Sequence, residues 1–197
     1  MKPASVTGLI IAAGLSGRMG KFKPLCEYKG ETYLDAIIRK LSLCCPGIVV
    51  VTGHNSNLIE DTLANRNPGG MIRTIHNPDY EKGMFSSLKR GIGECIHSEY
   101  ILYHFIDQPF LPESFYAGFI EKLNEGVDWL QPYYKGRGGH PLLLSRKTGC
   151  LILKEDDYSN LRNIKAKKEI IKEDWHCSYP GVLLDFDTPD DVEKFGK

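Results

Sequence analysis

The sequence predicts one α/β domain built on a mostly parallel central sheet flanked by helices. Strand-like apolar runs alternate with amphipathic helical segments over the first two thirds of the chain, which is typical of parallel α/β architecture. The 197 residues are enough for one sizeable core, and no repeat, linker or low-complexity segment divides them. We therefore expect a single domain over residues 1–197.

Hydrophobic spacing marks the elements of the first half. Leu34, Ile37 and Leu41 recur at helical spacing, whereas β-branched runs bounded by glycine or proline predict buried strands. The expected elements are, in order, a strand at 6–12, a helix at 34–41, a strand at 48–52, a helix at about 57–64 and a strand near 71–75.

In the second half of the chain the alternation of helices and strands is regular at first and becomes less regular beyond residue 127. Met84, Leu88 and Ile92 predict a helix, a strand at 100–106 follows, and Pro112 precedes another helix. Beyond residue 127 we expect short strands at 127–132, 141–144 and 182–184, with helical pieces between them. Such a tail is typical of a subregion that contributes substrate contacts.

Composition excludes several classes of protein. Balanced charge, with 25 acidic and 25 basic residues, argues against a nucleic-acid-binding surface. No apolar stretch approaches the ~20 residues of a membrane helix, and the apolar run before Gly14 is too short for a secretory signal. We expect a cytoplasmic protein that binds neither nucleic acid nor membrane.

The six cysteines show no metal-site spacing, since no two form a C-x-x-C pair and no histidine cluster accompanies them. The favoured interpretation is reduced thiols, several of them buried. Zinc binding or a disulfide scaffold is the open alternative.

A glycine-rich, cationic loop follows the first strand directly. Such loops bind phosphates, because glycine lets backbone N–H groups surround the oxygens while Arg or Lys supplies the counter-charge. Five residues separate Gly14 from Gly20-Lys21, so the loop is not a P-loop, and Leu15-Ser16 breaks the dinucleotide pattern. Arg18 and Lys23 are the candidate phosphate ligands, because fixed cations stabilise the negative charge of phosphate groups. The alternative is a solvated turn.

Two acidic motifs are candidate metal sites. Asp107 opens Asp-Gln-Pro at the end of a buried strand, where a carboxylate can hold Mg²⁺, although an Asp there also begins turns. Asp185 and Asp187 are alternate second ligands, and we prefer Asp187. Thr188 and the residues after it have the pattern of a helix start.

Other polar residues lie beside the same expected sheet edge. Gly53 follows the second strand, so it shares the edge with the glycine loop and Asp107. Ser86 and Ser87 would contact a base or sugar, or cap the helix that follows. His140, in a late glycine-rich loop, would contact a substrate phosphate, or it is a hydrogen-bonded structural residue.

The unbroken pattern Ala-Ala-Gly-x-Ser-x-Arg-Met-Gly-x-x-Lys at 12–23 resembles the signature loop of sugar-nucleotidyltransferase-like proteins. Gly-Met-x-x-Ser-Leu, Asp-Gln-Pro, Gly-His-Pro and Asp-x-Asp-Thr-Pro-x-Asp follow in order. Together they resemble the molybdopterin cytidylyltransferase-like family over nearly the whole chain.

The resemblance implies a Rossmann-like nucleotidyltransferase fold and a magnesium-dependent reaction. The terminal phosphate of molybdopterin would attack the α-phosphate of CTP and release pyrophosphate. Arg18, Lys23 and Asp107 would be catalytic, His140 would bind the acceptor, and Asp107 with Asp187 would bind Mg²⁺. The nucleotide would be bound by Ala12, Ala13, Gly14, Ser16, Gly17, Arg18, Lys23, Gly53 and Ser87. A molybdoenzyme or chaperone would receive the product.

Several alternatives stay open. The Ala-Ala-Gly start favours CTP, whereas Leu-Ala-Gly-Gly is usual in the GTP-using guanylyl branch. Polar and aromatic residues at 25–33 and an acidic stretch at 155–158 depart from the family pattern and bear on the acceptor. A sugar, polyol or choline phosphate is the alternative acceptor. A catalytically silent nucleotide- or pterin-binding accessory protein is the alternative outside enzymes.

Overall fold

A computed structural model of the chain describes residues 5–16, 19–64, 66, 70–186, 188 and 191. Among these residues the main sheet has eight strands in the order β10-β7-β9-β6-β1-β4-β5, with β8 paired to β7. The strands are β1 Val6–Ala12, β4 Gly47–Thr52, β5 Ile72–His76, β6 Tyr100–Phe105, β7 Trp129–Tyr134, β8 Arg137–Gly138, β9 Leu142–Ser145 and β10 Lys172–His176. A separate small hairpin pairs β2 Glu27–Tyr28 with β3 Glu31–Thr32.

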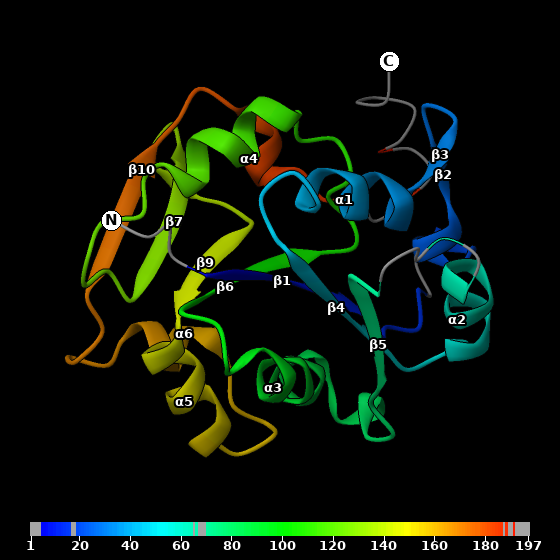
Figure 1. The fold of residues 1–197 in the computed structure, drawn as a ribbon, viewed down its shortest axis with the longest axis horizontal. Helices are drawn as coiled ribbons and strands as arrows, with labels where there is room; N and C mark the ends of the chain where they lie inside the picture. Colours follow the sequence, from blue (N-terminus) through cyan, green and yellow to red (C-terminus); the bar gives the residue numbers. More distant parts are fainter. Residues whose placement is uncertain are drawn as a thin grey trace.

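Helices cover both faces of the sheet (Figure 1). The α-helices are α1 Tyr33–Leu41, α2 Ser56–Ala64, α3 Met84–Cys95, α4 Glu113–Ile120, α5 Arg146–Lys154 and α6 Leu161–Lys165. Short 3₁₀ helices lie at η2 Lys23–Leu25, η3 Tyr80–Lys82 and η4 Pro180–Leu183. The α/β class, the mostly parallel sheet and the flanking helices that the sequence predicts are thus confirmed.

Strand β1 lies between β6 and β4 and is parallel to both. Beyond β6 the sheet becomes mixed, because β9 runs antiparallel to both β6 and β7. β1 is buried on its two faces, which explains its continuous apolar sequence. Its alternate side chains enter two different cores, Ile10 on one face and Leu9 on the other.

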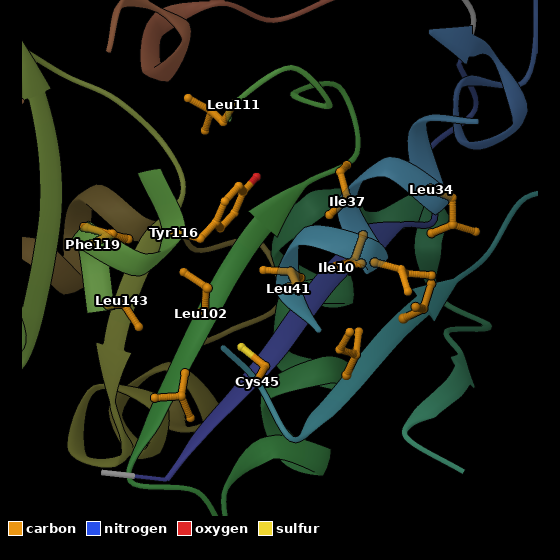
Figure 2. Close-up of a cluster of buried hydrophobic side chains, with 14 of the residues drawn as sticks. Ile10, Leu34, Ile37, Leu41, Cys45, Leu102, Leu111, Tyr116, Phe119 and Leu143 are labelled. Carbon is orange, nitrogen blue, oxygen red and sulfur yellow. The ribbon is translucent and has the colours of Figure 1, made fainter. Parts of the chain in front are cut away.

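The first core joins this sheet face to α1, α2 and α4 (Figure 2). Ile37 and Leu41 of α1 pack over Ile10, while Tyr116 and Phe119 of α4 pack toward β6 and β9. α1 begins where the Thr32 hydroxyl accepts a hydrogen bond from the backbone N–H of Asp35, as an N-cap residue does.

The second core joins the opposite face to α3, α5 and α6. Helix α3 approaches β1 and β4 closely at Gly91, where an added Cβ would lie 2.4 Å from Leu9 Cδ1 and 2.7 Å from Val51 Cγ2. Leu9 and Val51 are fully buried and have no space into which to move. Glycine at this position therefore fixes how near α3 lies to the sheet.

The strand expected at 182–184 is wrong. Pro180 begins the 3₁₀ turn η4 instead, and the turn buries Val182. The Val182 carbonyl accepts a hydrogen bond from the backbone N–H of His140. The apolar segment around Val182 therefore packs against a loop and does not pair as a strand of the sheet. In the described part of the chain, no helix is long and apolar enough to cross a membrane.

The close approach of α3 predicts opposite effects for two glycines of one helix. We expect Gly91→Ala to lower the free energy of unfolding by roughly 1–3 kcal/mol, because its Cβ overlaps buried side chains. Gly93 has no atom within 4 Å of the corresponding position, so Gly93→Ala should be stabilising by about 0.5–1 kcal/mol. Urea denaturation measures both, and a stabilising Gly91→Ala would contradict the packing account.

Candidate functional site

A cavity of about 390 Å³ opens at the carboxyl ends of β1 and β6. Ligands of open α/β sheets bind at this edge. The walls come from the loop after β1, from η2, from η3 with the start of α3, and from the turn after β6. The lining residues include Ala12, Ala13, Gly14, Ser16, Lys23, Tyr80, Gly83, Met84, Ser87, Phe105 and Asp107.

Ser16 shapes the loop that carries Lys23. Its backbone is left-handed, with φ of 55°, and its carbonyl accepts a hydrogen bond from the N–H of Met19. Its hydroxyl oxygen lies 3.1 Å from the backbone nitrogen of Lys23, from which it accepts a hydrogen bond. Ser16 therefore positions the first residue of η2, besides lining the cavity.

Lys23 and Asp107 meet across the cavity. The Lys23 Nζ lies 3.7 Å from Asp107 Oδ2.

 The two residues are far apart in sequence, and the parallel pairing of β1 with β6 brings them together. Both side chains are mostly buried, at 11% and 23% exposure, so their attraction is screened less than that of a surface pair.

The Asp107 turn is held from several sides. Lys40, a buried lysine of α1, donates a hydrogen bond to the Pro109 carbonyl, and burial lowers the pKa of Lys40 to about 8. The backbone N–H of Phe186 donates to the Asp107 carbonyl at 2.9 Å. This bond brings the C-terminal acidic segment beside the cavity.

Asp185, the alternate metal ligand, is engaged by the residue next to Asp107. Its Oδ1 accepts a hydrogen bond from Gln108 Nε2 at 2.8 Å. Gln108 is itself buried, so it ties the two acidic segments together. The preferred second ligand, Asp187, lies outside the described residues, as do Gly17 and Arg18.

Asn77 organises the start of α3. Its side-chain nitrogen donates to Ser87 Oγ at 2.9 Å and lies 3.1 Å from Ser86 Oγ. The Ser86 hydroxyl is directed to the carbonyls of Asp79 and Gly83, which is a structural use, whereas Ser87 lines the cavity. Ser87 therefore presents a hydroxyl near the positive end of the α3 dipole.

Gly53 lies behind the glycine loop rather than in the cavity wall. A Cβ there would lie 2.8 Å from the Ala13 carbonyl oxygen and 2.7 Å from Tyr80 Cβ. The adjacent His54 N–H donates to that same Ala13 carbonyl at 3.2 Å. Gly53 thus lets β4 support the loop, which is an indirect contribution to the site.

His140 lines a second cavity, of about 660 Å³, beside the first. Met84 and Phe105 line both cavities, so the two adjoin. The His140 ring packs edge-on against Phe105 with 4.3 Å between ring centroids. Burial lowers the pKa of His140 to about 4, so its imidazole is neutral at physiological pH.

The acidic stretch at 155–158 is engaged in ion pairs. Asp157 lies 2.7 Å from the Lys89 ammonium of α3, and Glu155 lies 2.9 Å from that of Lys167. Asp157 thus links α3 to the segment after α5, and Glu155 links that segment to the chain after α6. All six cysteines are free thiols, as expected. The described ranges contain no cluster of three or more His, Cys, Asp or Glu side chains suited to hold a metal.

Sequence reasoning missed part of the two cavities. Tyr80 and Gly83 line the first cavity beside the start of α3, and Gln131 and Lys165 line the second. Tyr80 lies in a turn after β5, where Pro78 signals only a break in the chain. Lys165 is the last residue of a five-residue helix. It begins the run Lys165-Ala166-Lys167-Lys168, which has the composition of a solvent-exposed basic segment.

Comparison with known proteins agrees with this geometry. Residues 8–171 match the family model described as MobA-like NTP transferase domain. The chain belongs to this family. It is therefore a nucleotidyltransferase, and the alternative of a protein outside the enzymes is set aside.

The similarity to a curated relative extends over nearly the whole chain. The molybdenum cofactor cytidylyltransferase of Escherichia coli strain K12 is 29% identical over 188 residues, which are 95% of this chain and 94% of that protein.

Two solved structures share the fold. A nucleotidyl transferase from Methanothermobacter thermautotroptrophicus superposes with a TM-score of 0.79 at 20% identity, over 96% of this chain and 95% of that one. Rv0371c of Mycobacterium tuberculosis, solved in complex with manganese, gives a TM-score of 0.73 at 18% identity, over 96% and 97% of the two chains.

The buried His140 predicts a pH-dependent contribution to stability. Its pKa is about 4 in the folded chain and about 6.5 as an ordinary value, so the unfolded chain binds the proton more tightly. The free energy of unfolding should therefore fall as the pH decreases from about 6.5 through about 4. His140→Gln removes this contribution.

Urea denaturation at pH 7 and pH 4.5 measures the effect. The His140→Gln variant should lose less stability than the wild type between these two pH values. Burial also lowers the pKa of His104, to about 3. Because His104 is present in both proteins, its effect on the free energy of unfolding cancels in the comparison. Equal losses in the two proteins would contradict a buried neutral His140.

Proposed function

We propose that this protein transfers CMP from CTP to a molybdopterin-type acceptor and releases pyrophosphate. The observation that carries the proposal is the meeting of Lys23 and Asp107 in a cavity at the carboxyl edge of the sheet. Membership of the MobA-like family and the 29% identity to a molybdenum cofactor cytidylyltransferase support this choice of substrates.

The first cavity would bind the nucleotide. The glycine loop presents Gly14 and Ser16 along one wall, and Lys23 supplies a cation within the same wall. Backbone N–H groups and a fixed ammonium stabilise the negative charge that develops on the α-phosphate and on departing pyrophosphate. The start of α3, with Ser87, adds the positive end of a helix dipole.

The residues at the edge of β6 fit Mg²⁺. Mg²⁺ is usually held by one or two carboxylates together with substrate phosphates rather than by a complete protein cage, so a cluster of three acidic side chains is not required. Asp107 would be the first ligand, with Asp187 or Asp185 as the second. Mg²⁺ held there would supply positive charge that neutralises part of the charge on the phosphates.

The second cavity would hold the acceptor. It adjoins the first at Met84 and Phe105, so a phosphate of the acceptor can reach the α-phosphate of CTP. An acceptor oxygen would form the new P–O bond as the bond to pyrophosphate breaks. Neutral His140 would contact the acceptor by packing and hydrogen bonding, since this transfer between phosphates needs little proton chemistry.

CTP is proposed in preference to GTP on two grounds. The Ala-Ala-Gly start of the loop resembles the cytidylyl branch, and Ala13 lies buried in the cavity wall. The relative that matches nearly the whole chain is also a cytidylyltransferase. A recipient molybdoenzyme or its chaperone would take up the dinucleotide product.

Pyrophosphate release tests the proposed substrates. With Mg²⁺ and molybdopterin present, we expect turnover with CTP to be at least about tenfold faster than with GTP, because a few contacts to the base give discrimination of this order. Omitting molybdopterin or chelating Mg²⁺ should abolish release. Turnover only with a sugar, polyol or choline phosphate would replace the proposed acceptor.

Substitutions test the proposed roles of the ion pair. Lys23→Met and Asp107→Asn should each lower kcat by about 10²-fold or more, because each removes a transition-state contact. Lys21→Met is a matched control, since Lys21 is exposed in the same loop and does not line the cavity. The control should retain activity within about twofold. Normal activity of both cavity variants would place the phosphate site elsewhere.

A further inference from the structure

The second cavity has an aromatic wall that extends away from the first. Trp129 and Tyr133 of β7 line it together with Phe105. Ring faces bind flat apolar or heteroaromatic groups and quaternary ammonium groups, whereas a polyol phosphate presents neither. With a volume of about 660 Å³, the cavity is also the larger of the two that adjoin at Met84.

Lys165 brings a positive charge onto this wall. Its ammonium lies 5.8 Å from the ring centroid of Trp129 and 5.5 Å from that of Tyr133, which is cation–π distance. Gln131 Oε1 accepts a hydrogen bond from it at 2.5 Å. Among the residues that the structure describes, no carboxylate forms a salt bridge with Lys165.

Gln131 holds this lysine in place. Its amide nitrogen donates to the Gly139 carbonyl at 3.1 Å, which orients the amide oxygen toward Lys165. Gly138 leaves room for the arrangement, because a Cβ there would lie 2.8 Å from the Gln131 amide nitrogen. The β7–β8 hairpin is thus shaped to present a cation inside a cavity.

Lys165 borders the second cavity and not the first. The reacting phosphates would lie near Lys23 and Asp107, beyond the shared wall at Phe105. A group that contacts Lys165 therefore belongs to the part of the acceptor that does not react. A cation without a carboxylate partner is suited to an anionic or carbonyl group at that end.

We infer that Lys165 is a specificity-determining residue for the acceptor. It binds a carbonyl or anionic oxygen on a flat heteroaromatic end of the acceptor, which packs against Trp129 and Tyr133. Gln131 is a positioning residue for Lys165. The inference rests on the proposed function only in assigning the acceptor to the second cavity, and it selects a pterin-like acceptor over a polyol phosphate.

Lys165→Met tests the inference, with Lys168→Met as a matched control. Lys168 is an exposed lysine three residues further along the chain, and it lines neither cavity. The Lys165 variant should raise KM for molybdopterin by roughly tenfold or more, as expected for loss of one charge-assisted hydrogen bond. KM for CTP should stay within about twofold. The Lys168 variant should match the wild type in both, and Lys165→Arg should restore part of the loss.

Calorimetric titration with molybdopterin, without CTP, separates this inference from the proposed function. If the wild type binds molybdopterin but releases no pyrophosphate, and Lys165→Met weakens binding, the proposed function fails and the inference stands. If the wild type turns over molybdopterin and Lys165→Met has unchanged KM and affinity, the inference fails and the function stands. Absence of molybdopterin binding, or turnover of a polyol phosphate that is insensitive to Lys165→Met, overturns the inference.

Discussion

The parallel pairing of β1 with β6 determines where the chemistry of this molecule can lie. Ile11 is in register with Phe105, so both strands end at the same edge of the sheet. The glycine loop and the Asp107 turn therefore start side by side, although they are remote in sequence. Pairing of β1 with β4 on its other side lets Gly53 approach the Ala13 carbonyl and support the loop. A change that shifted the β1–β6 register would separate Lys23 from Asp107.

Buried polar contacts turn this proximity into a defined geometry. Ser16 accepts a hydrogen bond from Lys23, Lys40 donates to the turn after Asp107, and Phe186 donates to the Asp107 carbonyl. These contacts hold the loop and the turn in place, and Lys23 and Asp107 thereby line the same cavity.

The sequence predicts those parts of the molecule that depend on local patterns. The strand at 6–12 has the predicted bounds, because a strand buried on both faces is continuously apolar. Asp107 and Ser87 lie near proline and glycine signals in the local sequence, and both line the cavity. The turn at Val182 and the placement of Lys165 depend on contacts with distant residues, His140 and Gln131 respectively. Contacts between residues far apart in sequence produce no periodic pattern of hydrophobic residues, so residue spacing alone does not predict them.

A crystal structure of the protein with CTP and Mn²⁺ tests the central claim most directly, because the anomalous signal of manganese locates the metal without reference to the protein. The account predicts the metal in direct coordination with the Asp107 carboxylate, and the triphosphate along Gly14 and Ser16 with Lys23 in contact. A metal without Asp107 among its ligands would contradict the account. So would a nucleotide bound at the opposite end of the sheet, in the groove lined by Asp128 and Arg146.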